Sequence, residues 1–180
     1  MKGRLASRMQ VSIRPARVED APALARIHVA SWRSAYTDVV PKSYLDQLDV
    51  PQRQARWSRI LRERESKTFV AETMAGVVGF VSVGKAREWA GPGTGELYAL
   101  YVAEEHKRRG VGTRLFHAGV ESLDADDHHG MMLWVFAKDP SGRAFYEKLG
   151  GVAGPTKVEE LSGVAVEEVS YVWAQLPGQG

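Results

Sequence analysis

Hydrophobic and polar positions along this chain follow two different periods. Alternating or continuously apolar runs, which are typical of strands, occupy residues 10–16, 67–73, 76–84, 96–102, 131–136, 157–161 and 164–173. Apolar residues recur at helical spacing over 18–36, 41–65, 111–123 and 140–150, and a break is expected at Pro51 in the second of these regions. Short Met-Ala-Gly and Ser-Gly connections join successive strands as hairpins. We therefore predict a mixed α/β fold in which helices flank a mostly antiparallel central sheet of about seven strands, in the order β-α-α-β-β-β-α-β-α-β-β.

Composition limits the classes of protein to which this chain can belong. Its 180 residues are 44% hydrophobic, which suffices for a single core, and its net charge is only +2. Such a balance argues against a protein that coats nucleic acid, so we expect no nucleic-acid partner. The absence of cysteine excludes disulfides, thiolate zinc sites and a cysteine nucleophile.

The N-terminal stretch is basic but has no apolar run of the kind found in signal peptides. No run elsewhere in the sequence approaches the length needed to span a membrane. We therefore expect a cytoplasmic protein without a membrane partner. Met9 is a candidate alternative start, so residues 1–8 are expected to form a disordered leader and residues 9–177 a single domain.

The most specific chemistry lies in the stretch KRRGVG, from Lys107 to Gly112, between a predicted strand and a predicted helix. Glycine lets the backbone approach a ligand closely, and a helix N-terminus presents free N–H groups that suit a phosphate. Basic side chains at this end of a helix, here including Arg114, oppose the helix dipole unless an anion compensates them. We interpret the turn as a phosphate site, and a solvated basic turn is the alternative.

Two common phosphate-binding loops do not fit this stretch. A Walker loop needs Gly-Lys followed by Ser or Thr, which the stretch does not contain. A dinucleotide fingerprint needs a third glycine where Leu115 stands, in a parallel βαβ unit near the start of the chain. A different ligand that contains a pyrophosphate remains.

The turn resembles the signature Gln/Arg-x-x-Gly-x-Gly/Ala of the GCN5-related N-acetyltransferases. A second motif of that family, Asn-x-x-Ala-x-x-Phe-Tyr before a glycine turn, is similar to DPSGRAFYEKLGG at 139–151. The strand at 96–102 and the region 28–48 also resemble bacterial members, so the resemblance covers essentially the whole chain. Lys107 replaces Gln/Arg and keeps a donor, whereas Asp139 replaces Asn and cannot donate when ionised.

The resemblance implies acetyl-CoA as co-substrate and direct transfer of its acetyl group to a primary amine in a ternary complex. It assigns cofactor binding to Leu100, Tyr101, Val102, Lys107, Arg108, Arg109, Gly110, Val111, Gly112, Thr113 and Asp139. The family's strand carries a bulge, expected here near Leu100 to Val102, whose backbone N–H would polarise the thioester carbonyl.

The chemistry calls for a proton acceptor and a proton donor. A primary amine has a pKa of about 10.4, so a base assists attack at neutral pH. Glu96 matches the general base of related histone acetyltransferases, and Tyr146 corresponds to the family's acid, which protonates the leaving thiolate. The alternatives are a surface carboxylate for Glu96 and a core aromatic for Tyr146. Tyr98, on the strand face of Glu96, and Tyr36, after the first helix, are candidate substrate contacts.

Other clusters indicate no separate chemistry. The segment DADDHHG at 124–130 lacks calcium-loop or zinc spacing, so no metal site is expected. Trp32, Tyr44 and Trp57 are expected mainly in the core. The acidic pairs Glu159–Glu160 and Glu167–Glu168 either lie on solvated faces or attract a cationic amine.

Two other functions stay open at this point. A non-catalytic acyl-CoA-binding regulatory protein would keep the glycine turn and tolerate the loss of Glu96 and Tyr146, both of which are present. An RNA- or DNA-binding module would need a basic face interleaved with exposed aromatics, and the sequence has one compact basic cluster. The sequence leaves open which amine is the acceptor, how long the acyl group is, and whether the protein forms a homodimer.

Overall fold

The computed structural model of the protein describes residues 10–87 and 90–178. The leader predicted over 1–8 lies outside the described residues, as do Met9 and two residues of the loop before β4. The strands are β1 (Ser12–Pro15), β2 (Lys67–Thr73), β3 (Gly76–Lys85), β4 (Thr94–Val102), β5 (Gly130–Phe136), β6 (Val152–Leu161) and β7 (Val164–Trp173). The helices are α1 (Ala21–Ala35), α2 (Lys42–Asp46), α3 (Val50–Glu63), α4 (Val111–Asp124) and α5 (Pro140–Lys148), with 3-10 turns η1 (Val18–Asp20) and η2 (Glu104–His106).

The strands form one sheet in the order β1-β2-β3-β4-β5-β7-β6. Neighbouring strands pair antiparallel except β4 and β5, which are parallel. The predicted mixed α/β fold with a mostly antiparallel seven-stranded sheet is therefore confirmed. The predicted Ser-Gly hairpin turn is also present, and Ser162 and Gly163 both take the positive φ that a tight two-residue turn requires.

Two element boundaries differ from the prediction. The region 41–65 contains two helices, because the chain turns at 47–49 and Asp49 then caps α3 by accepting a hydrogen bond from the backbone N–H of Gln52. Pro51 does not break a helix; it lies in the first turn of α3, where a missing N–H costs nothing. β6 begins at residue 152 rather than 157, because it is an edge strand, where Pro155 is tolerated.

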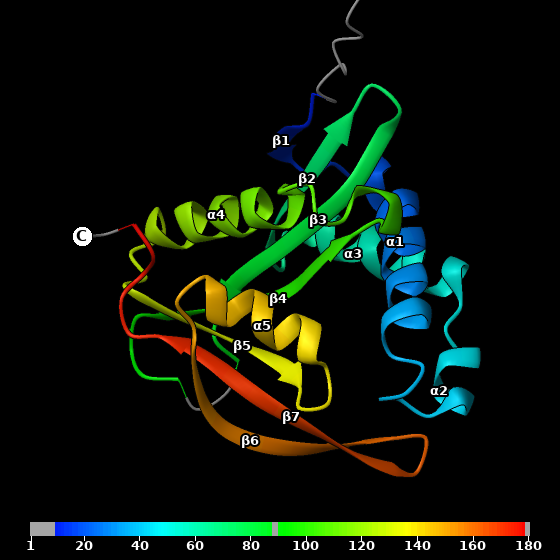
Figure 1. The fold of residues 1–180 in the computed structure, drawn as a ribbon. Helices are drawn as coiled ribbons and strands as arrows, with labels where there is room; N and C mark the ends of the chain where they lie inside the picture. The colour runs from blue at the N-terminus through cyan, green and yellow to red at the C-terminus, as the bar shows by residue number, and fades with distance from the viewer. Residues whose placement is uncertain (1–9, 88–89, 179–180) are drawn as a thin grey trace, which may run out of the picture.

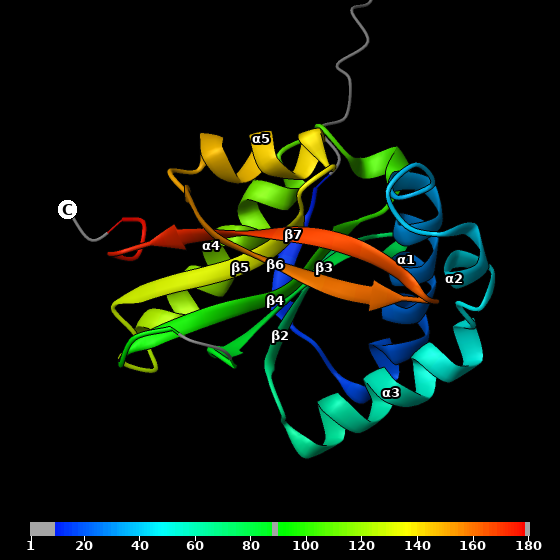
Figure 2. The same ribbon diagram turned by 90° about the horizontal axis from the view of Figure 1, so that it is seen from below.

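The helices cover the two faces of the sheet (Figures 1 and 2). α4 and α5 lie on one face, where Leu115, Phe116 and Tyr146 join the largest buried cluster. α1 and α3 lie on the other face, where Leu24 and Trp57 pack with the inner strands in a second cluster. The sheet is thus the middle layer of three.

A wedge opens in the centre of the sheet between β4 and β5. The two strands pair only where 94–96 lies beside 130–132, and each continues beyond that point without a ladder to the other. Figure 1 shows them diverging toward the ends that lead into α4 and α5. The facing strand edges therefore have backbone N–H and C=O groups available to a ligand.

Candidate functional site

The N-terminus of α4 stands at the open end of the wedge. Gly110 is its N-cap, with φ 80°, in the left-handed region that glycine adopts without strain. No side chain caps this helix, and a Cβ built on Gly110 would meet no atom within 4 Å. The first N–H groups of α4 therefore have no side-chain cap, as a site for an anion requires.

The basic side chains of the turn do not all point to the same place. Lys107 donates to Glu104 at 2.6 Å and so is already paired with an acid. Arg114 donates to the carbonyl of Val11 at 2.7 Å, which ties α4 to the start of β1. Arg108 and Arg109 are exposed. Two of the four basic residues thus remain for a ligand at the α4 N-terminus.

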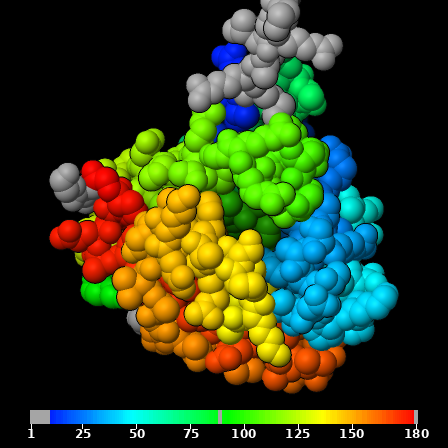
Figure 3. Space-filling view, in the orientation of Figure 1, coloured from blue at the N-terminus to red at the C-terminus, as the bar shows by residue number. Residues whose placement is uncertain are grey.

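Gly112, the second glycine of the motif, brings three elements together. A Cβ there would lie 3.4 Å from the ring of Phe145 on α5 and 3.8 Å from Leu100 on β4. These are ordinary contact distances, so Gly112 lies where α4, α5 and β4 meet, and a methyl group there would touch its neighbours without a clash. Figure 3 shows the surface dipping between the bright green, yellow and light blue segments, that is, around η2, the start of α5 and the end of α1.

The bulge in β4 lies earlier than predicted. The register against β3 shifts between Ser82 and Val83, which pair with Ala99 and Leu97. Tyr98 is therefore the extra residue, and the expected bulge at Leu100 to Val102 is wrong. The reason is local, because the Tyr98 ring packs against Gly84, whose missing Cβ would lie 2.6 Å from the phenol oxygen. Residues 98–101 are all half-buried and line the wedge.

Glu96 is neither a surface carboxylate nor free. Its side chain is 2% exposed, and it accepts hydrogen bonds from the backbone N–H of Arg87 at 2.9 Å and from the guanidinium of Arg87 at 2.5 Å. The Arg87 side chain is 62% exposed. Sequence reasoning missed this partner, because Arg87 lies in a loop without periodicity that brings it back onto the strand.

Tyr98 shares this arrangement and lies on the predicted face beside Glu96. The Arg87 guanidinium carbon is 4.5 Å from the centre of the Tyr98 ring, and the Tyr98 hydroxyl donates to the carbonyl of Lys85 at 2.5 Å. Burial, with a smaller contribution from the Glu96 charge, raises the pKa of Tyr98. Glu96, Arg87 and Tyr98 thus form one joined group at the narrow end of the wedge.

Tyr146 projects from α5 into the core side of the wedge. Its ring packs against Phe145 and Phe116, and the residue is 9% exposed. Within 10–87 and 90–178 no hydrogen bond involves its hydroxyl. Burial, followed by nearby Tyr101 and Asp139, raises the pKa of Tyr146, so the phenol keeps its proton at neutral pH.

Tyr36 and Tyr101 reach the same region from α1 and β4. Tyr36 caps the C-terminus of α1 and packs edge-on against Phe136 at 4.9 Å. The hydroxyl of Tyr101 accepts a hydrogen bond from the Trp32 indole N–H at 2.8 Å, which leaves its own proton available. Burial is the main cause that raises the pKa of both phenols, to about 12 for Tyr101. Three neutral hydroxyls therefore surround the wide part of the wedge.

Asp139 is the N-cap of its own helix, α5. Its carboxylate accepts a hydrogen bond from the backbone N–H of Gly142 at 2.9 Å and so caps α5. A Cβ at position 142 would lie 2.4 Å from the other carboxylate oxygen, so glycine there makes room for the cap. Asp139 thus presents no donor to a ligand amide.

Members of the remaining charged clusters form ion pairs within the protein. Asp126 of the DADDHHG segment pairs with Lys67 at 2.5 Å. On the last hairpin, Glu168 is half-buried and lies 3.5 Å from Lys157, whose ammonium stands over the Trp134 ring. Among the described residues, no cluster of three or more His, Cys, Asp or Glu could hold a metal ion, and no helix is long and apolar enough to cross a bilayer.

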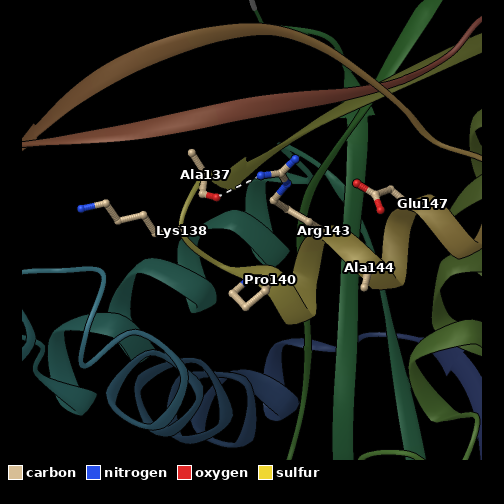
Figure 4. A pocket seen from close by; sticks show the side chains of 6 residues that line it. All are labelled: Ala137, Lys138, Pro140, Arg143, Ala144 and Glu147. Atoms are coloured by element: carbon tan, nitrogen blue, oxygen red, sulfur yellow. Dashed lines mark hydrogen bonds between the residues drawn. The ribbon is translucent and has the colours of Figure 1, made fainter.

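A separate hollow of about 520 Å³ lies outside the wedge, beside α5 (Figure 4). Arg143 and Glu147 point from α5 toward β6 and β7 there. Both are engaged, because Arg143 donates to the carbonyl of Ala137 and to the Tyr171 hydroxyl, which in turn donates to Glu147. The hollow therefore presents a satisfied network and not a set of unpartnered groups.

The comparisons with known proteins agree with this geometry. The model of the acetyltransferase (GNAT) family matches residues 24–151. The uncharacterized N-acetyltransferase YuaI of Bacillus subtilis (strain 168) is 35% identical over 168 residues, which are 92% of this chain and 94% of that protein.

Two solved structures share the fold. An N-acetyltransferase from Staphylococcus aureus Mu50 has a TM-score of 0.75 at 19% identity, covering 93% of this chain and 99% of its own. The PaiA N-acetyltransferase from Thermoplasma acidophilum, in complex with coenzyme A, has a TM-score of 0.67 at 20% identity, covering 89% and 98%. The chain belongs to the acetyltransferase (GNAT) family, as its two motifs predicted, and is an acetyltransferase enzyme.

Proposed function

We propose that this protein transfers the acetyl group of acetyl-CoA to the amine of an acceptor by direct attack in a ternary complex. The observation that carries the proposal is the uncapped N-terminus of α4, open to solvent at the wide end of the wedge. Free N–H groups and a positive dipole suit a pyrophosphate. A fold relative that holds coenzyme A supports the same class of ligand.

The cofactor would lie along the wedge. In this proposal the backbone N–H groups of 111–113 and the side chains of Arg108 and Arg109 bind the phosphates. The edge of β4 at Leu100 to Val102 offers backbone groups to the pantetheine amides. Lys107 contributes charge while paired with Glu104, and Asp139 contributes only the cap that fixes the start of α5.

The reaction forms a C–N bond and breaks a C–S bond. The acceptor nitrogen attacks the thioester carbonyl carbon, and the thiolate of coenzyme A leaves. Tyr146 gives this sulfur a proton, since its hydroxyl is neutral and engaged by no other group in the described chain. Holding amine and thioester together in the wedge supplies much of the acceleration.

Glu96 is the proposed acceptor of the amine proton, and its geometry imposes a condition. The donors bonded to its carboxylate all come from Arg87. An amine, or a water that relays its proton, must therefore share the carboxylate with Arg87 or displace the guanidinium. Tyr98, stacked under Arg87, and Tyr36, at the end of α1, are the proposed contacts of the acceptor.

The cofactor assignment can be tested by thermal unfolding with acetyl-CoA. Ligand that binds the folded state raises the melting temperature by mass action. Gly112→Asp places a negative charge in the first turn of α4, which favours the free helix but repels phosphate. We expect its apo melting temperature to be unchanged or higher and its acetyl-CoA shift to be lost.

Gly91→Asp is the matched control, because Gly91 is exposed and a Cβ there meets no atom within 4 Å. This variant should keep the full acetyl-CoA shift. Release of free coenzyme A with a panel of amines then measures transfer itself. Absence of any shift in wild type at millimolar acetyl-CoA would contradict the proposal, and binding without turnover of any amine would reassign the protein to non-catalytic acyl-CoA binding.

A further inference from the structure

Arg53 on α3 is a half-buried cation without a partner. Its guanidinium makes no hydrogen bond or ion pair with any described residue, although the side chain is partly removed from water. Burial, together with the neighbouring charge of Arg56, lowers the pKa of Arg53. Arg59 on the same helix differs, because it lies 3.0 Å from Glu65 and is more than half exposed. In the described chain Arg53 therefore lacks the kind of acidic partner that Arg59 has on the same helix.

Two more polar groups beside Arg53 lack partners. Trp57, one turn further along α3, is 5% exposed, and its indole N–H has no acceptor in the described chain. His28 on α1 is 9% exposed, its ring centre is 6.2 Å from that of Trp57, and its Nδ1 has no partner either. Buried polar atoms without partners are uncommon in folded proteins and call for a water or a ligand.

This group of residues adjoins the proposed reaction centre. His28 stacks on Tyr101 of β4 with ring centres 4.8 Å apart. After burial, the charge of Arg53 contributes to the lowered pKa of His28, and it offsets part of the rise that burial causes in the pKa of Tyr101. Tyr101 in turn influences Tyr146, the proposed acid. Ring contacts thus run from Trp57, one helical turn beyond Arg53 on the α1–α3 side of the sheet, through His28 to Tyr101 at the wedge.

The positive charge of Arg53 has no acidic partner in the described chain, which indicates that the acceptor carries a negatively charged group. Two carboxylates near the wedge already have cations, since the buried Glu96 binds Arg87 and the half-buried Glu168 lies beside Lys157. Arg53 and Arg56, three residues apart on one helix, repel one another and have no acid between them. An anion supplied by the acceptor would relieve this repulsion.

We propose that Arg53, assisted by Arg56, binds a carboxylate of the acceptor, so that the substrate is an amino acid whose amine reaches the thioester past Tyr101. This inference rests on the proposed acetyltransferase reaction and specifies its substrate class. Hydrogen bonds between a guanidinium and a carboxylate are charge-assisted and can be bidentate, which would fix the orientation of the amine as well as add affinity.

The test compares matched acceptors and matched variants. Free L-amino acids and their α-carboxamides are assayed for release of coenzyme A at saturating acetyl-CoA. We expect the wild type to prefer an acid over its amide in kcat/KM by about tenfold or more, the range for loss of a charged hydrogen bond. Arg53→Met should abolish this preference by raising KM for the acid alone, and Arg53→Lys should restore part of it.

Arg62→Met is the control, because it removes an exposed positive charge from the same helix and should leave the preference intact. The comparison of acid with amide in wild type needs no variant, so the inference stays testable even if Arg53→Met folds poorly. Equal rates for acids and amides, or turnover of other amines but of no amino acid, would overturn the inference and leave the proposed function standing. Failure of every amine would overturn the proposed function itself.

Discussion

Removing Arg87 and removing Glu96 should destabilise the protein unequally, although the two side chains form one ion pair. The carboxylate of Glu96 is 2% exposed, whereas the side chain of Arg87 is 62% exposed. Without its partner, the guanidinium can be hydrated where it lies. The carboxylate cannot, and among the described residues it keeps only the backbone N–H of residue 87 as a donor.

The two costs can be estimated from these exposures. Stranding a buried charge by deleting its partner costs roughly 3–5 kcal/mol, and the remaining N–H brings Arg87→Met toward the lower end, about 3 kcal/mol. Glu96→Gln leaves a cation that is already 62% exposed to water and replaces the carboxylate with a neutral group of the same shape, so about 1 kcal/mol is expected. For a chain of this length each 1 kcal/mol corresponds to roughly 2–4 °C in melting temperature.

Urea or thermal unfolding of both variants and of the double variant measures this difference. The double variant should be close to Glu96→Gln alone, because Arg87→Met does no further harm once the buried charge is gone. Lys85→Met, which removes an exposed cation at the end of β3, two residues before Arg87, controls for the loss of charge. Equal losses for the two single variants would refute the reasoning. The pH–rate profile of Glu96→Gln then tests the base role, since a defect that does not shrink as pH rises toward the pKa of the amine would exclude it.

Two further outcomes follow from the buried rings of the site. Tyr146→Phe should leave folding and acetyl-CoA affinity nearly unchanged, because no described residue bonds the hydroxyl. The same change should lower kcat by about 10²-fold or more. An unchanged kcat in single-turnover measurements would make the residue part of the core only. Burial, with Arg53 and Arg56, lowers the pKa of His28 from 6.5 to about 3. The unfolded state therefore takes up a proton at a higher pH than the folded state does. The free energy of unfolding should fall as pH drops below 6.5, by about 2 kcal/mol at pH 5. His28→Phe should remove this dependence in denaturant titrations at pH 7 and pH 5, and an identical pH dependence in the two proteins would show that His28 does not carry it.

The order of elements could be predicted because each depends on neighbours in sequence. Apolar periodicity marked the helices and strands, and the Ser162–Gly163 pair marked the last hairpin. The turn that we propose as the cofactor site could be picked out for the same reason, since Gly110 and the basic residues around it are contiguous. Signals of this kind need no knowledge of distant contacts.

The acceptor side could not be predicted, because it depends on contacts between segments far apart in the chain. Arg87 returns to Glu96 from a loop, and the bulge at Tyr98 follows from the absence of a side chain at Gly84 on the next strand. Arg53 looked like one of several basic residues on a polar helix. Its proposed role follows only from the fold, which places Arg53 near Trp57 and His28 and pairs its guanidinium with no acid among the described residues.

The two sides of the wedge differ in a way that bears on how the amine loses its proton. Arg108 and Arg109 lie near α4 at the open end, and Arg53 lies on α3 on the α1–α3 side of the sheet, while neutral phenols such as Tyr101 line the centre. An ammonium placed among neutral, desolvated groups is disfavoured relative to the free amine. Binding an amino acid by its carboxylate would therefore carry the amine into surroundings that lower the amine's own pKa. A larger fraction of the bound amine is then already deprotonated, so the reaction depends less on a base. This is consistent with a Glu96 that stays paired with Arg87.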